Sequence, residues 1–121
     1  MALEFTLDQE QDHVLVRLTG NLTLGPQLKQ FARRMAAVFA LPDLCGVLLN
    51  MRGVDQIDSA GLGELVILYT SSGEAGCRLC LVAPTSQVLR LLATTMLSNL
   101  FPTFTDEDSA RTWVRSLPRK G

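Results

Sequence analysis

The sequence has few of the residues that would supply chemistry of its own. It contains one histidine, His13, and neither a glycine-rich phosphate loop ending in Lys-Ser or Lys-Thr nor a dinucleotide-binding fingerprint. A serine–histidine–aspartate triad would need His13 to reach a distant serine. Asp55 and Asp58, three residues apart, are better suited to capping a helix and solvating a loop than to acid–base catalysis. We therefore expect neither enzyme activity nor a cofactor.

Charge of one sign and long apolar runs are also missing. The 121 residues carry 11 basic and 12 acidic side chains, which gives no electrostatic reason to expect binding to nucleic acid. No apolar run approaches the ~20 residues of a membrane span, and the first residues do not resemble a signal peptide. With 47% hydrophobic residues, the chain is expected to be one cytoplasmic domain over residues 1–121, frayed at 118–121.

The three cysteines are an odd number, which argues against a disulfide framework. Cys77 and Cys80 have the spacing of half a redox or metal site, but residues three apart in a strand point to opposite faces. No second pair accompanies them, so we expect the cysteines, including Cys45, to be buried small hydrophobic residues and expect no metal site. His13 lies beside a polar turn and is expected to be solvated.

Hydrophobic periodicity predicts strands and helices that alternate along the chain. Their order favours a single α/β domain with a mixed, mostly parallel sheet of about five strands and four helices. The expected elements are an antiparallel hairpin of strands over 3–7 and 13–18, a helix from Pro26 that ends before Pro42, a strand over 46–50, a helix over 59–72, a strand over 77–83, a helix capped by Thr85 or Ser86, a short edge strand over 100–105, and a helix that is capped by Thr105 and buries Ala110, Trp113, Val114 and Leu117.

The stretch Val54–Leu62 is the part of the chain best placed to carry a function. It is predicted to be a polar loop that leads from an apolar strand into a helix, with Asp58 or Ser59 as the N-cap. Gly61 and Gly63 each cost the first helical turn roughly 1 kcal/mol relative to alanine. This cost indicates that something else favours them, such as the close approach of another chain.

The helix that follows is predicted to have two apolar faces. One of them, beside Glu64, is expected to be an exposed strip that runs up to Ser59 and consists of Ala60, Gly63 and Ile67. Scattered exposed apolar residues are normal, so the strip is either ordinary surface or a docking surface. The residues predicted to face the core are Leu62, Leu65, Val66 and Tyr69.

The segment from Asp58 to Gly63, Asp-Ser-Ala-Gly-Leu-Gly, resembles the phosphoacceptor motif of the anti-sigma factor antagonists in the STAS domain family. In that family an Asp-Ser-x-Gly-Leu segment opens the second helix, and an anti-sigma factor kinase phosphorylates its serine. The resemblance implies helices gathered largely on one face of the sheet and phosphorylation of Ser59. It also implies an anti-sigma factor or related serine kinase as partner, with a phosphatase as a further candidate. The implied partner surface consists of Thr23, Asp58, Ala60, Gly61, Gly63, Glu64 and Ile67.

Two positions depart from the family pattern. The loop after the second strand commonly carries an aspartate that contacts the partner, and this chain has Thr23 there. The strand before the motif often ends in aspartate, and this chain has Asn50. Because both changes remove negative charge, a second hypothesis is a STAS scaffold that is not phosphorylated, in a stress-sensing or lipid-transport complex. A third is small-ligand or nucleotide binding at the same loop.

Overall fold

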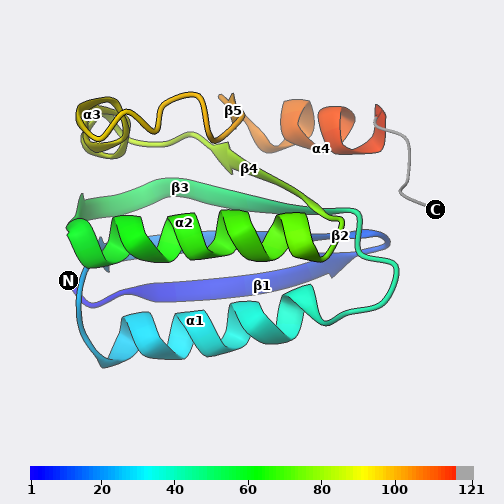
Figure 1. The fold of residues 1–121 in the computed structure, drawn as a ribbon, viewed down its shortest axis with the longest axis horizontal. Helices are drawn as coiled ribbons and strands as arrows, with labels where there is room; N and C mark the ends of the chain where they lie inside the picture. The colour runs from blue at the N-terminus through cyan, green and yellow to red at the C-terminus, as the bar shows by residue number, and fades with distance from the viewer. Residues whose placement is uncertain (117–121) are drawn as a thin grey trace.

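Within the described residues, five strands form one sheet in which spatial order follows chain order (Figure 1). The computed structural model describes residues 1–116, so Leu117 and the tail at 118–121 lie outside the described residues. The first two strands are antiparallel, and each later strand is parallel to its neighbour. The strands are β1 (Glu4–Glu10), β2 (His13–Leu22), β3 (Gly46–Ile57), β4 (Arg78–Val82) and β5 (Thr103–Phe104).

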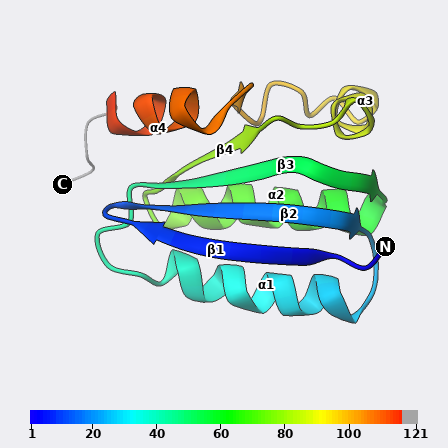
Figure 2. The ribbon, with the colours of Figure 1, turned by 180° about the vertical axis from the view of Figure 1, so that it is seen from behind.

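Four helices in the described part of the chain cover this sheet unequally, which confirms the α/β class predicted from the sequence. The helices are α1 (Pro26–Phe39), α2 (Ser59–Glu74), α3 (Ser86–Thr94) and α4 (Glu107–Ser116). The first three pack into one core on the same face, and α4 packs on the other. Accordingly, α2 lies in front of β2 in Figure 1 and behind it in Figure 2.

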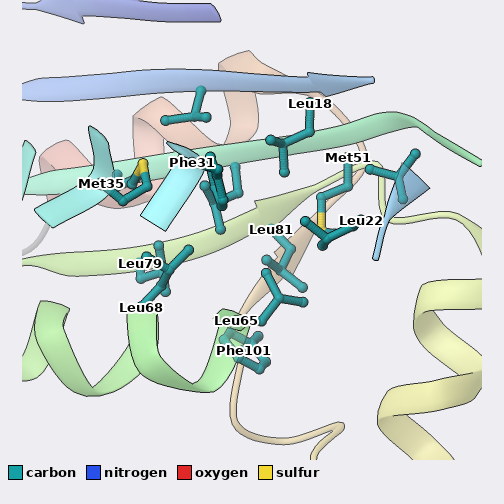
Figure 3. Packing of buried hydrophobic residues seen from close by; sticks show 14 of the residues in the cluster. Leu18, Leu22, Phe31, Met35, Met51, Leu65, Leu68, Leu79, Leu81 and Phe101 are labelled. Atoms are coloured by element: carbon teal, nitrogen blue, oxygen red, sulfur yellow. The ribbon is translucent and has the colours of Figure 1, made fainter. Parts of the chain in front are cut away.

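The larger core lies between the sheet and helices α1, α2 and α3. The smaller core, beneath α4, contains Leu48, Cys80 and Val114. Since β3 is covered on both faces, its residues 47–49 form a continuous apolar run with no exposed surface. Figure 3 shows part of the larger core, with labels on Leu18, Leu22, Phe31, Met35, Met51, Leu65, Leu68, Leu79, Leu81 and Phe101.

Strand β3 continues through the stretch that the sequence predicted to be a polar loop. Val54 is buried and pairs with Gly20, and Ile57 pairs with Leu22. The sequence predicted a loop here because the two residues between them, Asp55 and Gln56, are polar. In the structure both belong to the strand and are exposed. The long β2 supplies the pairing partner, with register shifts that bend both strands.

The prediction for the inward face of α2 was partly wrong. Leu62 and Leu65 are buried, but Val66 is half-buried and Tyr69 is 40% exposed. Leu68 and Ser72 are buried instead, because the helix rests on the face centred between Leu65 and Leu68. The helix carries apolar residues of its own on most of its sides, so periodicity alone did not single out one buried face. Tyr69 still packs its ring edge-on against Phe101, with centroids 5.7 Å apart.

The cysteines divide between the two cores, as the strand geometry predicted. Cys77 belongs to the larger core and Cys80 to the smaller, whereas Cys45 is half-buried rather than buried. All three thiols are free. Burial raises the pKa of both Cys77 and Cys80 to about 12. These two thiols are therefore protonated at neutral pH and poorly reactive.

His13 is fully buried, which corrects the prediction of a solvated histidine. Its Nδ1 lies 3.3 Å from Asp12 Oδ1, and its Nε2 lies 3.3 Å from Glu10 Oε1 without a hydrogen bond. Arg111 of α4 donates to the same Glu10 oxygen at 3.0 Å. The sequence could not show this burial, because it depends on a helix about a hundred residues away.

A polar network centred on Glu107 fixes the start of α4 over the sheet. Arg17 donates through Nε and Nη2 to the two carboxylate oxygens of Glu107, at 2.9 and 2.8 Å. Asn50 Nδ2 donates to Glu107 Oε2 at 2.7 Å, and Asn50 Oδ1 accepts from the Arg52 amide at 3.0 Å. An aspartate at position 50 would face the Glu107 carboxylate, so the packing of α4 favours asparagine over aspartate here.

The N-cap of α4 is Asp106 rather than Thr105. The Ser109 amide donates to Asp106 Oδ1 at 2.8 Å, and Thr105 Oγ1 only supports the cap by donating to Asp106 Oδ2 at 3.2 Å. Ala110 and Val114 are buried as predicted, and Trp113 is half-buried.

The Glu107 network predicts acid sensitivity. Hydrogen bonds, first from Arg17 and then from Asn50, lower the pKa of Glu107 from 4.5 to about 2. Because the folded value lies below the unfolded one, this stabilisation is complete above pH 4.5 and is lost as the pH falls toward about 2. Glu107→Gln should lower the free energy of unfolding by about 1–3 kcal/mol near neutral pH.

Urea unfolding from neutral pH to about pH 3 measures this effect. The wild-type and Glu107→Gln curves should converge on acidification. Asp55→Asn, an exposed change on β3, is the control and should run parallel to wild type. A constant gap between wild type and Glu107→Gln would contradict the assignment.

Candidate functional site

The Asp58 carboxylate joins the β2–α1 loop to the first turn of α2. Its Oδ1 accepts from the Gly61 amide at 2.9 Å, which makes Asp58 the N-cap, and its Oδ2 accepts from the Leu24 amide at 3.0 Å. These backbone hydrogen bonds, from Leu24 first and Gly61 second, lower the pKa of Asp58. One carboxylate therefore holds the loop that carries Thr23 beside the helix that carries Ser59.

Ser59 is the first residue of α2 and is exposed. Its hydroxyl makes no hydrogen bond within residues 1–116, and Asp58 already provides the cap. Free amides and the helix dipole at a helix start favour a negative group. The Ser59 hydroxyl is thus accessible for modification, and a phosphate there would be locally tolerated.

The two glycines of the first turn have different roles. A Cβ on Gly61 would collide with the carbonyl oxygen of Leu22, so glycine allows α2 to lie against the end of β2. Gly61 is accordingly buried. A Cβ on Gly63 would meet nothing within 4 Å, and Gly63 is exposed. The fold therefore explains Gly61 and leaves Gly63 unexplained.

The apolar strip on α2 is present, but fewer of its residues are exposed than the sequence predicted. Ile67 is 57% exposed and Gly63 is exposed, whereas Ala60 is half-buried and packs against the core. Glu64, beside the strip, is only 8% exposed. Burial raises the pKa of this carboxyl.

Leu24 is a candidate site residue that sequence reasoning missed. Its side chain is 75% exposed, and its amide is bound to Asp58 at the start of α2. The available signal was an apolar residue in a short loop, between Thr23 and the Gly25 that precedes α1. Thr23 itself is half-buried.

Small hollows flank this site on both sides. One, of about 230 Å³, is lined by Asn21, Thr23 and Gln27 together with the first residues of the chain. The other, of about 220 Å³, lies where Ile57 meets α3. Both are smaller than the roughly 300–1,000 Å³ of typical small-molecule pockets, so this geometry favours a protein partner over a small ligand.

Comparison with known proteins agrees with this arrangement. The STAS domain family model matches residues 4–110. The chain belongs to the STAS domain family. This confirms the resemblance seen in the segment that begins at Asp58. No curated protein sequence matches the chain. Within residues 1–116 of this STAS domain, no helix is long and apolar enough to cross a membrane.

Several solved structures share the STAS fold of this chain. A candidate anti-sigma factor antagonist from Thermotoga maritima is 23% identical over 92% of this chain and 94% of its own, with a TM-score of 0.82. SpoIIAA in its unphosphorylated form is 19% identical over 95% and 99%, with a TM-score of 0.81. A murine anion transporter of the Solute Carrier 26 family is 16% identical over 91% of this chain but only 19% of its own, with a TM-score of 0.77. These identities establish the fold alone.

The two glycines predict opposite effects on stability. Gly63→Ala should raise the free energy of unfolding by about 0.5–1 kcal/mol, because alanine is the better helix former and its Cβ meets nothing. Gly61→Ala should lower it by about 1–3 kcal/mol, because the new Cβ collides with Leu22. Urea unfolding of both variants measures the difference.

Gly73 provides a matched control for Gly63, since it lies near the other end of α2 and its Cβ would also meet nothing. Gly73→Ala should stabilise the domain as Gly63→Ala does. If the surface around Gly63 contacts a partner protein, binding to that partner should weaken for Gly63→Ala and not for Gly73→Ala. Wild-type stability in Gly61→Ala would contradict the assigned role of the Leu22 contact.

Proposed function

We propose that this STAS domain is a regulatory protein-interaction module, similar to an anti-sigma factor antagonist, and that a partner serine kinase switches it by phosphorylating Ser59. The observation that carries the proposal is the exposed, unbonded hydroxyl of Ser59 beside the capping Asp58. The fold shared with SpoIIAA, which exists in unphosphorylated and phosphorylated forms, supports it.

In the proposed cycle, the unmodified domain binds the kinase through the surface around Ser59. Phosphorylation adds close to two negative charges and three strong acceptor oxygens. The amides at the start of α2 accommodate these charges, so the fold is retained. Binding is lost because the phosphate would enter an interface that also includes the exposed apolar side chains of Leu24 and Ile67, where its desolvation is costly. The proposed contact residues are Thr23, Leu24, Asp58, Ser59, Ala60, Gly63, Glu64 and Ile67, with Gly61 holding the helix in place.

The kinase supplies all the chemistry in this proposal, and the domain acts as its substrate and ligand rather than as an enzyme. A phosphatase would restore the unmodified form. The proposed cycle requires ATP, so we propose that it operates in the cytoplasm, and the net charge of -1 gives no electrostatic reason to expect binding to nucleic acid.

A STAS scaffold that is never phosphorylated is the second candidate. Two observations favour it. This chain has Thr23 where the family pattern commonly has an aspartate, so the loop lacks that carboxylate. A transporter also contains a domain of the same fold. The other departure, Asn50, carries no weight for either candidate, because its amide is used by Glu107 on the opposite face of the sheet.

Incubation with ATP and each anti-sigma factor kinase encoded in the same genome, followed by mass spectrometry, tests the proposal. We expect one phosphate on the wild type, at Ser59, and none on Ser59→Ala. Since Asp58 is the cap, Ser59→Ala should change the free energy of unfolding by no more than about 0.5 kcal/mol. Ser59→Asp should remain folded and weaken the kinase complex.

Ser86 offers the matched control, because it is the exposed first residue of α3 and follows its own cap, Thr85. Ser86→Asp makes the same chemical change at an equivalent helix position and should leave kinase binding unchanged. Calorimetry would show whether wild type, Ser59→Ala and Ser59→Asp bind with equal affinity. Equal affinities, without phosphate on any of them, would reject the switch and favour the scaffold.

A further inference from the structure

Glu64 is the only buried acidic residue among residues 1–116, and it has no partner. Its carboxylate accepts no hydrogen bond there and has no cationic group within 4 Å. Three of the half-buried acids, Glu107, Asp58 and Glu10, are each held by donors, namely side chains for Glu107 and Glu10 and backbone amides for Asp58. Glu64 therefore differs from these carboxylates, because it is more buried than they are and has no donor.

No neighbouring element compensates the charge of Glu64. Residues three and four positions away on α2, such as Ala60 and Ile67, are all uncharged, and α2 contains no basic residue. The adjacent helix α1 carries Lys29, Arg33 and Arg34, which are exposed and form no ion pair with Glu64. An isolated buried carboxylate destabilises a fold, so Glu64 is not explained by stability.

The carboxylate nevertheless remains open to the surface. Among the described residues, the only fully enclosed side-chain polar atom without a hydrogen bond is His13 Nε2. The Glu64 oxygens, which also lack hydrogen bonds, are thus not sealed. They border the exposed strip formed by Gly63 and Ile67.

We infer that Glu64 is a specificity residue of the docking surface and receives a cationic side chain of the partner kinase, next to an apolar side chain that packs on Ile67. This inference rests on the proposed function. Burial has already removed part of the hydration of the carboxylate before the partner arrives, so an incoming guanidinium or ammonium gains the attraction with less dehydration of the acid than at a fully exposed site. Gly63 leaves room for the approach.

Charge also argues for a different protein rather than a second copy of this chain. A copy docked symmetrically through the same surface would bring a second Glu64 and no cation from its own α2. Like charges would then face each other at low exposure, which opposes association.

Calorimetry with the purified anti-sigma factor kinases that are used for Ser59 tests the inference. Glu64→Gln keeps the shape of the side chain and removes the charge. We expect at least roughly tenfold weaker kinase binding, together with a melting temperature equal to or above that of wild type. Glu74→Gln is the matched control, because Glu74 is the other acid of α2 and is exposed at its far end, and it should bind like wild type.

The possible outcomes separate this inference from the function on which it rests. Equal kinase binding by wild type and Glu64→Gln would overturn the inference and leave the proposed function standing. A lower melting temperature for Glu64→Gln would overturn it too, because Glu64 would then be structural. If the wild type forms a dimer and Glu64→Gln does not, the partner of this surface is a second copy of the chain rather than a kinase. That result would also overturn the inference. If no kinase binds the wild type, both proposals fail.

Discussion

The geometry of the site depends on the two hydrogen bonds that the Asp58 carboxylate accepts from amides of different segments. One of them starts α2, and the other ties the β2–α1 loop to that start. Gly61 makes the arrangement sterically feasible, because any larger residue would push the helix off the end of β2. Because Asp58 provides the cap and Gly61 the close packing, Ser59 is exposed and is not needed for either.

The two faces of the sheet have separate tasks. Helices α1 to α3 bury the larger core and present the Ser59 surface, whereas α4 covers the other face through Val114 and the Glu107 network. Asn50 belongs to that second face. The departure of this chain from the family pattern at Asn50 therefore concerns the packing of α4 and not the surface around Ser59.

Gly63 and Glu64 are adjacent, and neither is the residue that stability alone would select. Alanine at 63 would favour the helix, and an uncharged residue at 64 would avoid a buried charge without a partner. Local departures from foldability tend to mark functional positions. Their location near Ser59 and the exposed Ile67 supports the proposal that this surface binds a partner.

The sequence by itself determined the order of strands and helices, the family and the position of Ser59 at a helix start, because these depend on periodicity, capping residues and a short motif. Only the tertiary structure decided that Asp58 rather than Ser59 is the cap, that β3 continues to Ile57, and that His13 and Glu64 are buried. Two of these depend on segments distant in sequence: β3 pairs with the long β2 as far as Ile57, and His13 pairs with Gly46, which lies beneath Val114 of α4. The cap itself is local, because Asp58 accepts from the Gly61 amide, but the same carboxylate also accepts from the distant Leu24 amide. Helix α2 has apolar residues on nearly every side, so its sequence did not show whether Leu68 or Tyr69 is buried. The packing of the neighbouring helices and sheet decided that Leu68 is.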